Sequence, residues 1–196
     1  MEILTVCTGN ICRSPLAEVL LATRLADLSP VVRSAGVRGL PAAPMTPEAV
    51  DLAVHFGVPE EVADAHRSRY LTEGMLTAPD LILAMTRDHR RAIAELAPAR
   101  LRSTFTVREF ARLSATVSDD ELRVAADRVG ADAGDRVRAA AAVVAAYRGI
   151  VPPPDDPADD DVIDPYRREW EVYQLSAQQL VPALAAVERV LRAVSP

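Results

Sequence analysis

Apolar residues recur along this 196-residue chain with two periods, and together they predict strands that alternate with helices. Short, largely apolar runs typical of buried strands occur at Glu2–Val6, Val31–Ser34, Asp80–Met85 and Ser103–Thr106. Helical spacing follows them, at residues 14–25, 47–57, 86–96 and 107–113, and a short helix is expected after Thr72. Ser14 and Pro15 are the expected N-cap and first position of the first helix. The pattern therefore predicts an α/β fold, a single three-layer domain with a central four-stranded parallel sheet flanked by helices.

The regular alternation stops after Leu113. Residues 119–149 are alanine-rich and predict a helical hairpin, with Gly130 and Gly134 as the expected breaks and Val137, Ala141 and Val144 at helical spacing. Residues 152–161 contain four prolines and five aspartates, which predicts an irregular acidic loop. A long amphipathic helix is expected from about Arg168 to Val194.

Composition narrows the classes of function. Hydrophobic residues make up 49% of the chain and the mean hydropathy is +0.07, which suits one core. The net charge of -6 has the wrong sign for a nucleic-acid partner. No apolar run is long enough to span a membrane, and the first residues lack the order of a secretion signal, so we expect a cytoplasmic protein that binds no membrane.

The two cysteines, Cys7 and Cys12, are too close in sequence for a disulfide to stabilise the fold by much. A chemical role is therefore the better interpretation. His55, His66 and His89 share no ligand spacing with one another or with the cysteines, so no metal or other cofactor is expected. We expect His55 and His89 to lie on helix surfaces.

The loop from Cys7 to Ser14 lies between the first predicted strand and helix, where parallel α/β folds bind phosphate. A thiolate attacks phosphorus well, but a free cysteine is mostly protonated at neutral pH, so the loop must stabilise the charged sulfur. The helix N-terminus, Arg13 and the hydroxyl of Ser14 can do so. Five residues separate Cys7 from Arg13, which lets the backbone curl round a tetrahedral anion while Gly9 supplies the turn. A buried cysteine in an ordinary turn is the alternative.

Residues 6–15 read Val-Cys-Thr-Gly-Asn-Ile-Cys-Arg-Ser-Pro. They resemble the signature of the low-molecular-weight protein tyrosine phosphatases, Val-Cys-x-Gly-Asn-x-Cys-Arg-Ser-Pro. The likeness extends through Ser34-Ala35-Gly36, residues 66–69, residues 80–85 and Asp164-Pro165-Tyr166. This resemblance implies a phosphatase that hydrolyses phosphotyrosine in proteins through a phosphocysteine, with Cys7 as nucleophile, Arg13 as phosphate clamp and Asp164 as proton donor.

The resemblance also implies the roles of further residues. The substrate would be bound by Thr8, Gly9, Asn10, Ile11, Cys12, Ser14 and Tyr166. Asn10, Ser34 and His66 would hold the loop in its shape through hydrogen bonds. Cys12 would form a reversible disulfide with Cys7 that shields the nucleophile from further oxidation.

Several alternatives stay open. Within a domain of residues 1–196, the insertion at about 114–160 departs from the family; it would shape the cleft, form a dimer contact or, as the default, be a solvated decoration. The chain would be a monomer or a weak homodimer. Asp161 and its acidic neighbours compete with Asp164 as the proton donor. A protein-arginine phosphatase of the same family would carry threonine in place of Ile11, and a phosphocarrier would hold phosphate on Cys7 without hydrolysis.

Overall fold

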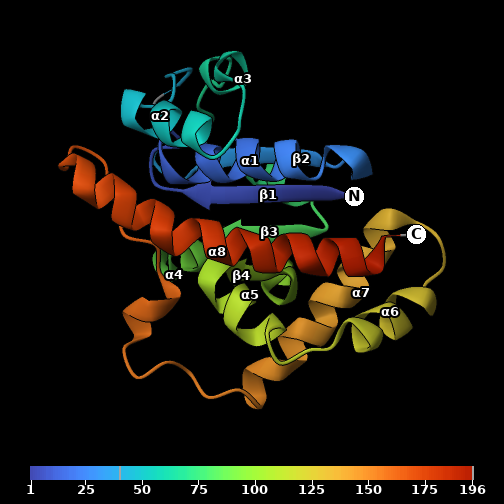
Figure 1. The fold of residues 1–196 in the computed structure, drawn as a ribbon. Helices are drawn as coiled ribbons and strands as arrows, with labels where there is room; N and C mark the ends of the chain where they lie inside the picture. Colours follow the sequence, from blue (N-terminus) through green and yellow to red (C-terminus); the bar gives the residue numbers. More distant parts are fainter. Residues whose placement is uncertain (40, 196) are drawn as a thin grey trace.

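A four-stranded parallel sheet forms the middle layer of the molecule, as predicted (Figure 1). The computed structural model describes residues 1–39 and 41–195. The strand order is β2-β1-β3-β4, and every pair of neighbours is parallel. The strands are β1 (Glu2–Cys7), β2 (Val31–Gly36), β3 (Leu81–Ala84) and β4 (Thr104–Thr106).

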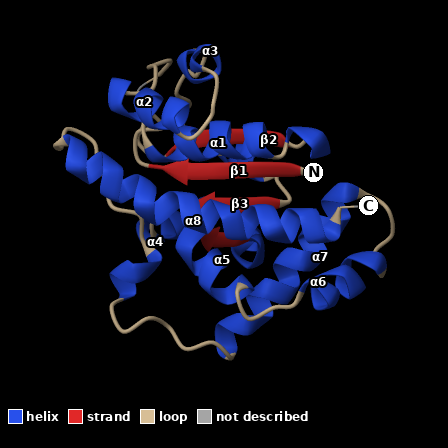
Figure 2. Ribbon diagram, in the orientation of Figure 1, coloured by secondary structure: helices blue, strands red, loops and turns tan. Residues whose placement is uncertain are grey.

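Helices cover both faces of this sheet (Figure 2). The α-helices are α1 (Arg13–Arg24), α2 (Pro47–His55), α3 (Glu60–Asp64), α4 (Arg87–Leu96), α5 (Val107–Ser114), α6 (Asp119–Asp127), α7 (Ala133–Ala146) and α8 (Trp170–Val194). Short 3₁₀ turns are η1 (Ala26–Leu28), η2 (Glu73–Leu76), η3 (Pro98–Ser103), η4 (Tyr147–Gly149) and η5 (Pro157–Asp160). The sequence pattern missed α3, whose five residues are too few for a periodic signal.

Side chains of β1 and β3 alternate between two apolar clusters, because successive residues of a strand point to opposite faces. Leu4, Val6, Ile82 and Ala84 pack with Ile93 of α4 and Leu76 of η2. Ile3, Leu81 and Leu83 belong to the larger cluster, which joins the sheet to α1, α5, α7 and α8. Burial on both faces explains why residues 80–85 are almost wholly apolar.

Two local expectations about helix ends need correction. The first helix begins at Arg13 with Cys12 as its N-cap, so Ser14 lies inside the helix. Gly130 breaks the chain after α6 with φ +97, as expected, but Gly134 lies within α7. A Cβ at Gly134 would lie 2.8 Å from a carboxylate oxygen of the buried Asp80, so glycine is needed there for close approach.

The helical hairpin formed by α6 and α7 is part of the core. Val137, Ala141 and Val144 are buried in the larger apolar cluster. A dimer contact through these three residues is therefore wrong, and so is a solvated decoration. Arg138 of α7 pairs with Asp80, which directly precedes β3, so α7 meets the sheet at the end opposite the loop after Cys7.

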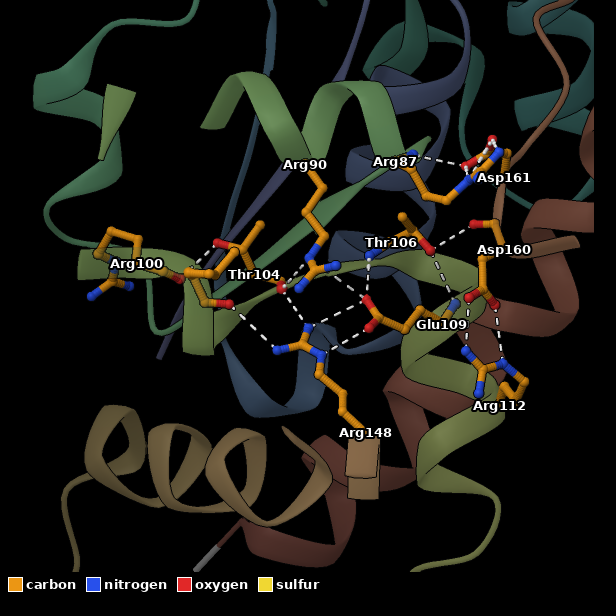
Figure 3. A network of polar contacts seen from close by, with 11 residues as sticks. Arg87, Arg90, Arg100, Thr104, Thr106, Glu109, Arg112, Arg148, Asp160 and Asp161 are labelled. Carbon is orange, nitrogen blue, oxygen red and sulfur yellow. Dashed lines mark hydrogen bonds and ion pairs between the residues drawn. The ribbon is translucent and has the colours of Figure 1, made fainter. Parts of the chain in front are cut away.

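A polar network joins the end of the hairpin and the acidic loop to β4 and α5 (Figure 3). The guanidinium of Arg148 donates to Glu109 at 2.8 Å and to the Thr104 carbonyl at 2.7 Å, and it stacks over Phe105 at 4.1 Å. Asp160 receives two hydrogen bonds from Arg112, the shorter at 2.7 Å. Arg112 thus fixes the position of the acidic loop a few residues before Asp164.

Candidate active site

The loop after β1 has a conformation set by Asn10, which takes a left-handed backbone at φ 55. Asparagine tolerates this region better than most residues. Gly36 allows the loop to lie close to β2, since a Cβ there would be 2.6 Å from the carbonyl oxygen of Thr8. The backbone N–H of Asn10 points back at the Cys7 sulfur at 3.2 Å.

The Cys7 sulfur receives hydrogen bonds at the bottom of the loop. Besides the Asn10 N–H, the hydroxyl of Ser14 donates to it at 3.0 Å. Cys7 is only 2% exposed and lies just before the N-terminus of α1. Two hydrogen-bond donors and the N-terminus of a helix thus lie close to this sulfur.

A buried hydrogen-bond network supports this loop from behind. The Asn10 amide donates to Ser14 Oγ at 3.0 Å and to Ser34 Oγ at 2.6 Å, and His66 Nε2 donates to the Asn10 carbonyl at 2.8 Å. The expected grouping of Asn10, Ser34 and His66 is therefore present. Glu18, which the sequence did not single out, accepts from Ser34 and lies 3.5 Å from His66 Nδ1. Its position one turn after Ser14 on α1 is the signal that could have found it.

Arg13 is 3% exposed and links the loop to the segment before α8. It donates to the Val162 carbonyl at 3.0 Å and to Thr8 Oγ1 at 3.3 Å, and it pairs with an Asp164 carboxylate oxygen at 2.8 Å. Its buried Nε has no partner among the described residues. The Asp164 side chain remains 51% exposed. Arg13 and Asp164, far apart in sequence, therefore meet beside Cys7.

The segment that carries Asp164 is anchored on both sides. Asp161 accepts from the backbone N–H of Arg87 at 2.7 Å and pairs with its guanidinium at 3.0 Å (Figure 3). The backbone N–H of Ile163 donates to Gln179 of α8 at 2.8 Å. Asp161 thus serves as an anchor, with its carboxylate paired to Arg87.

A cavity of about 300 Å³ opens above the Cys7 sulfur. The predicted residues that line it are Cys7, Thr8, Gly9, Ile11, Cys12, Arg13, Asp164 and Tyr166. Asn10 and Ser14 support the loop beneath it instead. Arg38 and Arg167 also line the cavity, and neither is among the site residues that the sequence predicts. A second groove of about 680 Å³ adjoins it and shares Thr8, Arg13, Arg38 and Asp164 with it.

Cys12 contacts α8 and the start of α2. Its sulfur lies 3.5 Å from Thr46 Oγ1 and 3.8 Å from the Tyr173 hydroxyl. Burial raises the pKa of the Cys12 thiol to about 11, so this sulfur is protonated at neutral pH. Burial also raises the pKa of Tyr173. The two cysteines thus have separate hydrogen-bond partners.

The expectation that His89 lies on a helix surface is wrong, because this side chain is only 5% exposed. Burial, with the nearby charge of Arg13, lowers its pKa to about 4. His55 is exposed, as expected.

The described residues, 1–39 and 41–195, contain no group of three or more His, Cys, Asp or Glu side chains that could hold a metal ion. In that same part of the chain, no helix has the length and apolar character needed to cross a membrane.

Together, the fold and the site define a class of α/β protein in which a cysteine and an arginine stand at the two ends of one loop, between a parallel strand and the next helix. The chain belongs to the low molecular weight phosphotyrosine protein phosphatase family, whose model matches residues 2–124. That match includes Cys7 and Arg13 but ends within the hairpin, before Asp164.

Known relatives include phosphatases of two kinds. The low molecular weight protein-tyrosine-phosphatase Etp of Escherichia coli strain K12 is 47% identical over 97 residues, which are 50% of this chain and 62% of that protein. The protein-arginine-phosphatase of Bacillus subtilis strain 168 is 39% identical over 112 residues, or 56% of this chain and 72% of that protein. The aligned region thus spans less than two thirds of the length of the Escherichia coli relative.

Similarity in structure extends over nearly the whole chain. The crystal structure of the low molecular weight protein tyrosine phosphatase from T. tengcongensis superposes with a TM-score of 0.65 and 28% sequence identity. The superposition covers 96% of this chain and 97% of that one.

Proposed function

We propose that this chain hydrolyses phosphotyrosine in protein or peptide substrates through a phosphocysteine on Cys7, without a metal or other cofactor. One observation carries the proposal. The Cys7 sulfur, with two hydrogen-bond donors, lies at the bottom of a cavity that Arg13 and Asp164 also line. A nucleophile, an anion clamp and a proton donor thus share one cavity.

In the first step the Cys7 thiolate attacks phosphorus, so an S–P bond forms while the bond from phosphorus to the tyrosyl oxygen breaks. Asp164, in its protonated form, gives its proton to the departing phenolate. The Arg13 guanidinium, which contacts Asp164 at 2.8 Å, grips two phosphate oxygens and releases Asp164 toward the leaving group.

In the second step a water molecule attacks phosphorus and gives a proton to Asp164. The S–P bond breaks, inorganic phosphate leaves, and the Cys7 thiolate is restored. The hydroxyl of Ser14 and the N–H of Asn10 stabilise this sulfur as it is expelled, because both already donate to it.

We favour phosphotyrosine over phosphoarginine as the substrate because Ile11 and Tyr166 both line the cavity and offer apolar contact to a phenyl ring. Protein-arginine phosphatase is the second candidate, favoured by the Bacillus subtilis relative of that name. A cytoplasmic location and a monomeric or weakly dimeric state stay predictions, as do the domain limits 1–196 with the insertion at about 114–160.

The test uses p-nitrophenyl phosphate with a chelator present, followed by phosphotyrosine and phosphoarginine peptides. Cys7→Ser should lose turnover but still bind vanadate, because the loop amides and Arg13 remain. Cys12→Ser is the matched control and should retain most activity. Residual hydrolysis by Cys7→Ser would show that Cys7 is not the nucleophile. Stoichiometric labelling of the parent without turnover would indicate a phosphocarrier. A higher kcat/KM on phosphoarginine than on phosphotyrosine peptides would favour the protein-arginine phosphatase.

A further inference from the structure

The wall of the phosphate cavity is backed by a buried histidine that the mechanism above does not use. The ring of His89 bridges two hydroxyl groups: Nε2 lies 2.9 Å from Thr8 Oγ1, and Nδ1 lies 2.8 Å from Thr86 Oγ1. With its lowered pKa the ring is neutral at neutral pH, so it carries a single N–H. The position of that proton decides which hydroxyl donates to the ring.

The tautomer of His89 therefore determines whether the Thr8 hydroxyl donates to the ring or accepts from it. The Thr8 oxygen also accepts a hydrogen bond from Arg13 at 3.3 Å. A hydroxyl has one proton and two lone pairs. If Nε2 carries the ring proton, the Thr8 oxygen accepts from both His89 and Arg13, and its own O–H is available to the cavity that Thr8 lines. If Nδ1 carries the ring proton, the Thr8 hydroxyl donates its hydrogen bond to Nε2 and is no longer a donor to the cavity.

Contacts on the other side of the ring are compatible with a proton on Nε2. The Thr86 oxygen caps α4 by accepting from the backbone N–H of His89 at 3.3 Å, which leaves its proton for Nδ1. A phosphate dianion in the cavity selects this same tautomer, because only then does it gain the Thr8 hydroxyl as a donor.

We propose that His89 is a positioning residue of the phosphate site, which holds Thr8 so that its hydroxyl donates to the bound phosphate alongside Arg13 and the loop amides. The phosphate chemistry on which this rests is that of the proposed function. Thr8 is then a specificity-determining residue that favours the dianion over smaller or less charged anions, since the extra hydrogen bond strengthens with charge.

The experiment measures the Kd of inorganic phosphate by calorimetry, which needs no turnover. Thr8→Val removes the hydroxyl and Thr8→Ser keeps it. His89→Gln keeps an N–H near the place of Nε2, whereas His89→Asn reaches only the place of Nδ1. We expect Thr8→Val and His89→Asn each to raise the Kd about tenfold, the loss of one hydrogen bond to a charged group. Thr8→Ser and His89→Gln should stay near the parent, as should the exposed control His55→Asn.

A double variant separates positioning from a general loss of structure. In the Thr8→Val background, His89→Asn should raise the Kd no further, because the hydroxyl through which His89 acts is gone. An equal rise in both backgrounds, or no rise in the parent, would overturn the proposal. If the parent and its variants show the expected Kd values but the parent hydrolyses no aryl phosphate, the proposed function is wrong while the role of His89 in phosphate binding stands.

A second measurement needs no variant. Nitrogen-15 NMR of the histidine rings in the vanadate complex at neutral pH should show His89 neutral, with its proton on Nε2. A proton on Nδ1 in that complex would overturn the proposal.

Discussion

Asn10 is expected to control both the stability of the fold and the shape of the phosphate loop. Its side chain makes three hydrogen bonds, to Ser14 Oγ at 3.0 Å, to Ser34 Oγ at 2.6 Å and from the Arg69 N–H at 2.8 Å. At about 1 kcal/mol each, their loss in Asn10→Ala costs about 3 kcal/mol of unfolding free energy. The left-handed backbone at φ 55 adds about 1 kcal/mol for alanine, which gives about 4 kcal/mol in total.

Asn10→Gly separates these two contributions, because glycine loses the hydrogen bonds but takes φ 55 without strain. Its unfolding free energy, measured in urea at equal m-value, should be about 1 kcal/mol higher than that of Asn10→Ala. Both variants should weaken phosphate binding, since the N–H that points at Cys7 is no longer held. Asp132→Ala, which removes the cap of α7, is the matched control and should cost about 1 kcal/mol without changing phosphate binding. A loss below about 1 kcal/mol in Asn10→Ala, or unchanged phosphate binding, would refute the reasoning.

Three further predictions concern the reaction. Asp164→Asn should slow phosphotyrosine hydrolysis by about 10² to 10⁴-fold and affect p-nitrophenyl phosphate much less, because a good leaving group needs little protonation. Asp161→Asn, which loosens the anchor at Arg87, should show no such dependence on the leaving group in steady-state rates; if it does, the wrong carboxylate has been chosen. Cys12→Ser should keep most activity but fail to recover with thiol after peroxide treatment, because no partner is left for an oxidised Cys7; unchanged recovery would exclude the protective disulfide. Ile11→Thr should lower kcat/KM on phosphotyrosine peptides and raise it on phosphoarginine, a change of about 1 to 3 kcal/mol in discrimination. An unmoved ratio of the two rates would show that Ile11 is not the selector.

The structure reduces the electrostatic effect of two aspartates in the acidic loop. By their charge alone, Asp160 and Asp161 would repel acidic substrates. Both carboxylates are paired, with Arg112 and Arg87, so their charge is largely neutralised locally. Their contribution is to hold the segment that leads to Asp164.

Those features of the protein that depend on local spacing could be predicted from the amino-acid sequence. Only five residues, which link the end of a strand to the start of a helix, separate Cys7 from Arg13, so their meeting follows from short-range geometry. The apolar runs likewise predicted the four strands and the class of fold, because period and burial are local properties of the chain.

The residues from distant parts of the sequence that reach this loop could be identified only from the packing of the folded chain. Asp164 stood among several aspartates, and only the fold brings it to Arg13 while Asp161 is turned to Arg87. The surface prediction for His89 failed because a helical residue beside a strand end can be buried by a neighbouring loop, here Thr8. The apolar stripe of α7 indicates that another surface covers this helix, but periodicity does not say which one. Only the folded structure shows that the stripe packs into the core of the same chain.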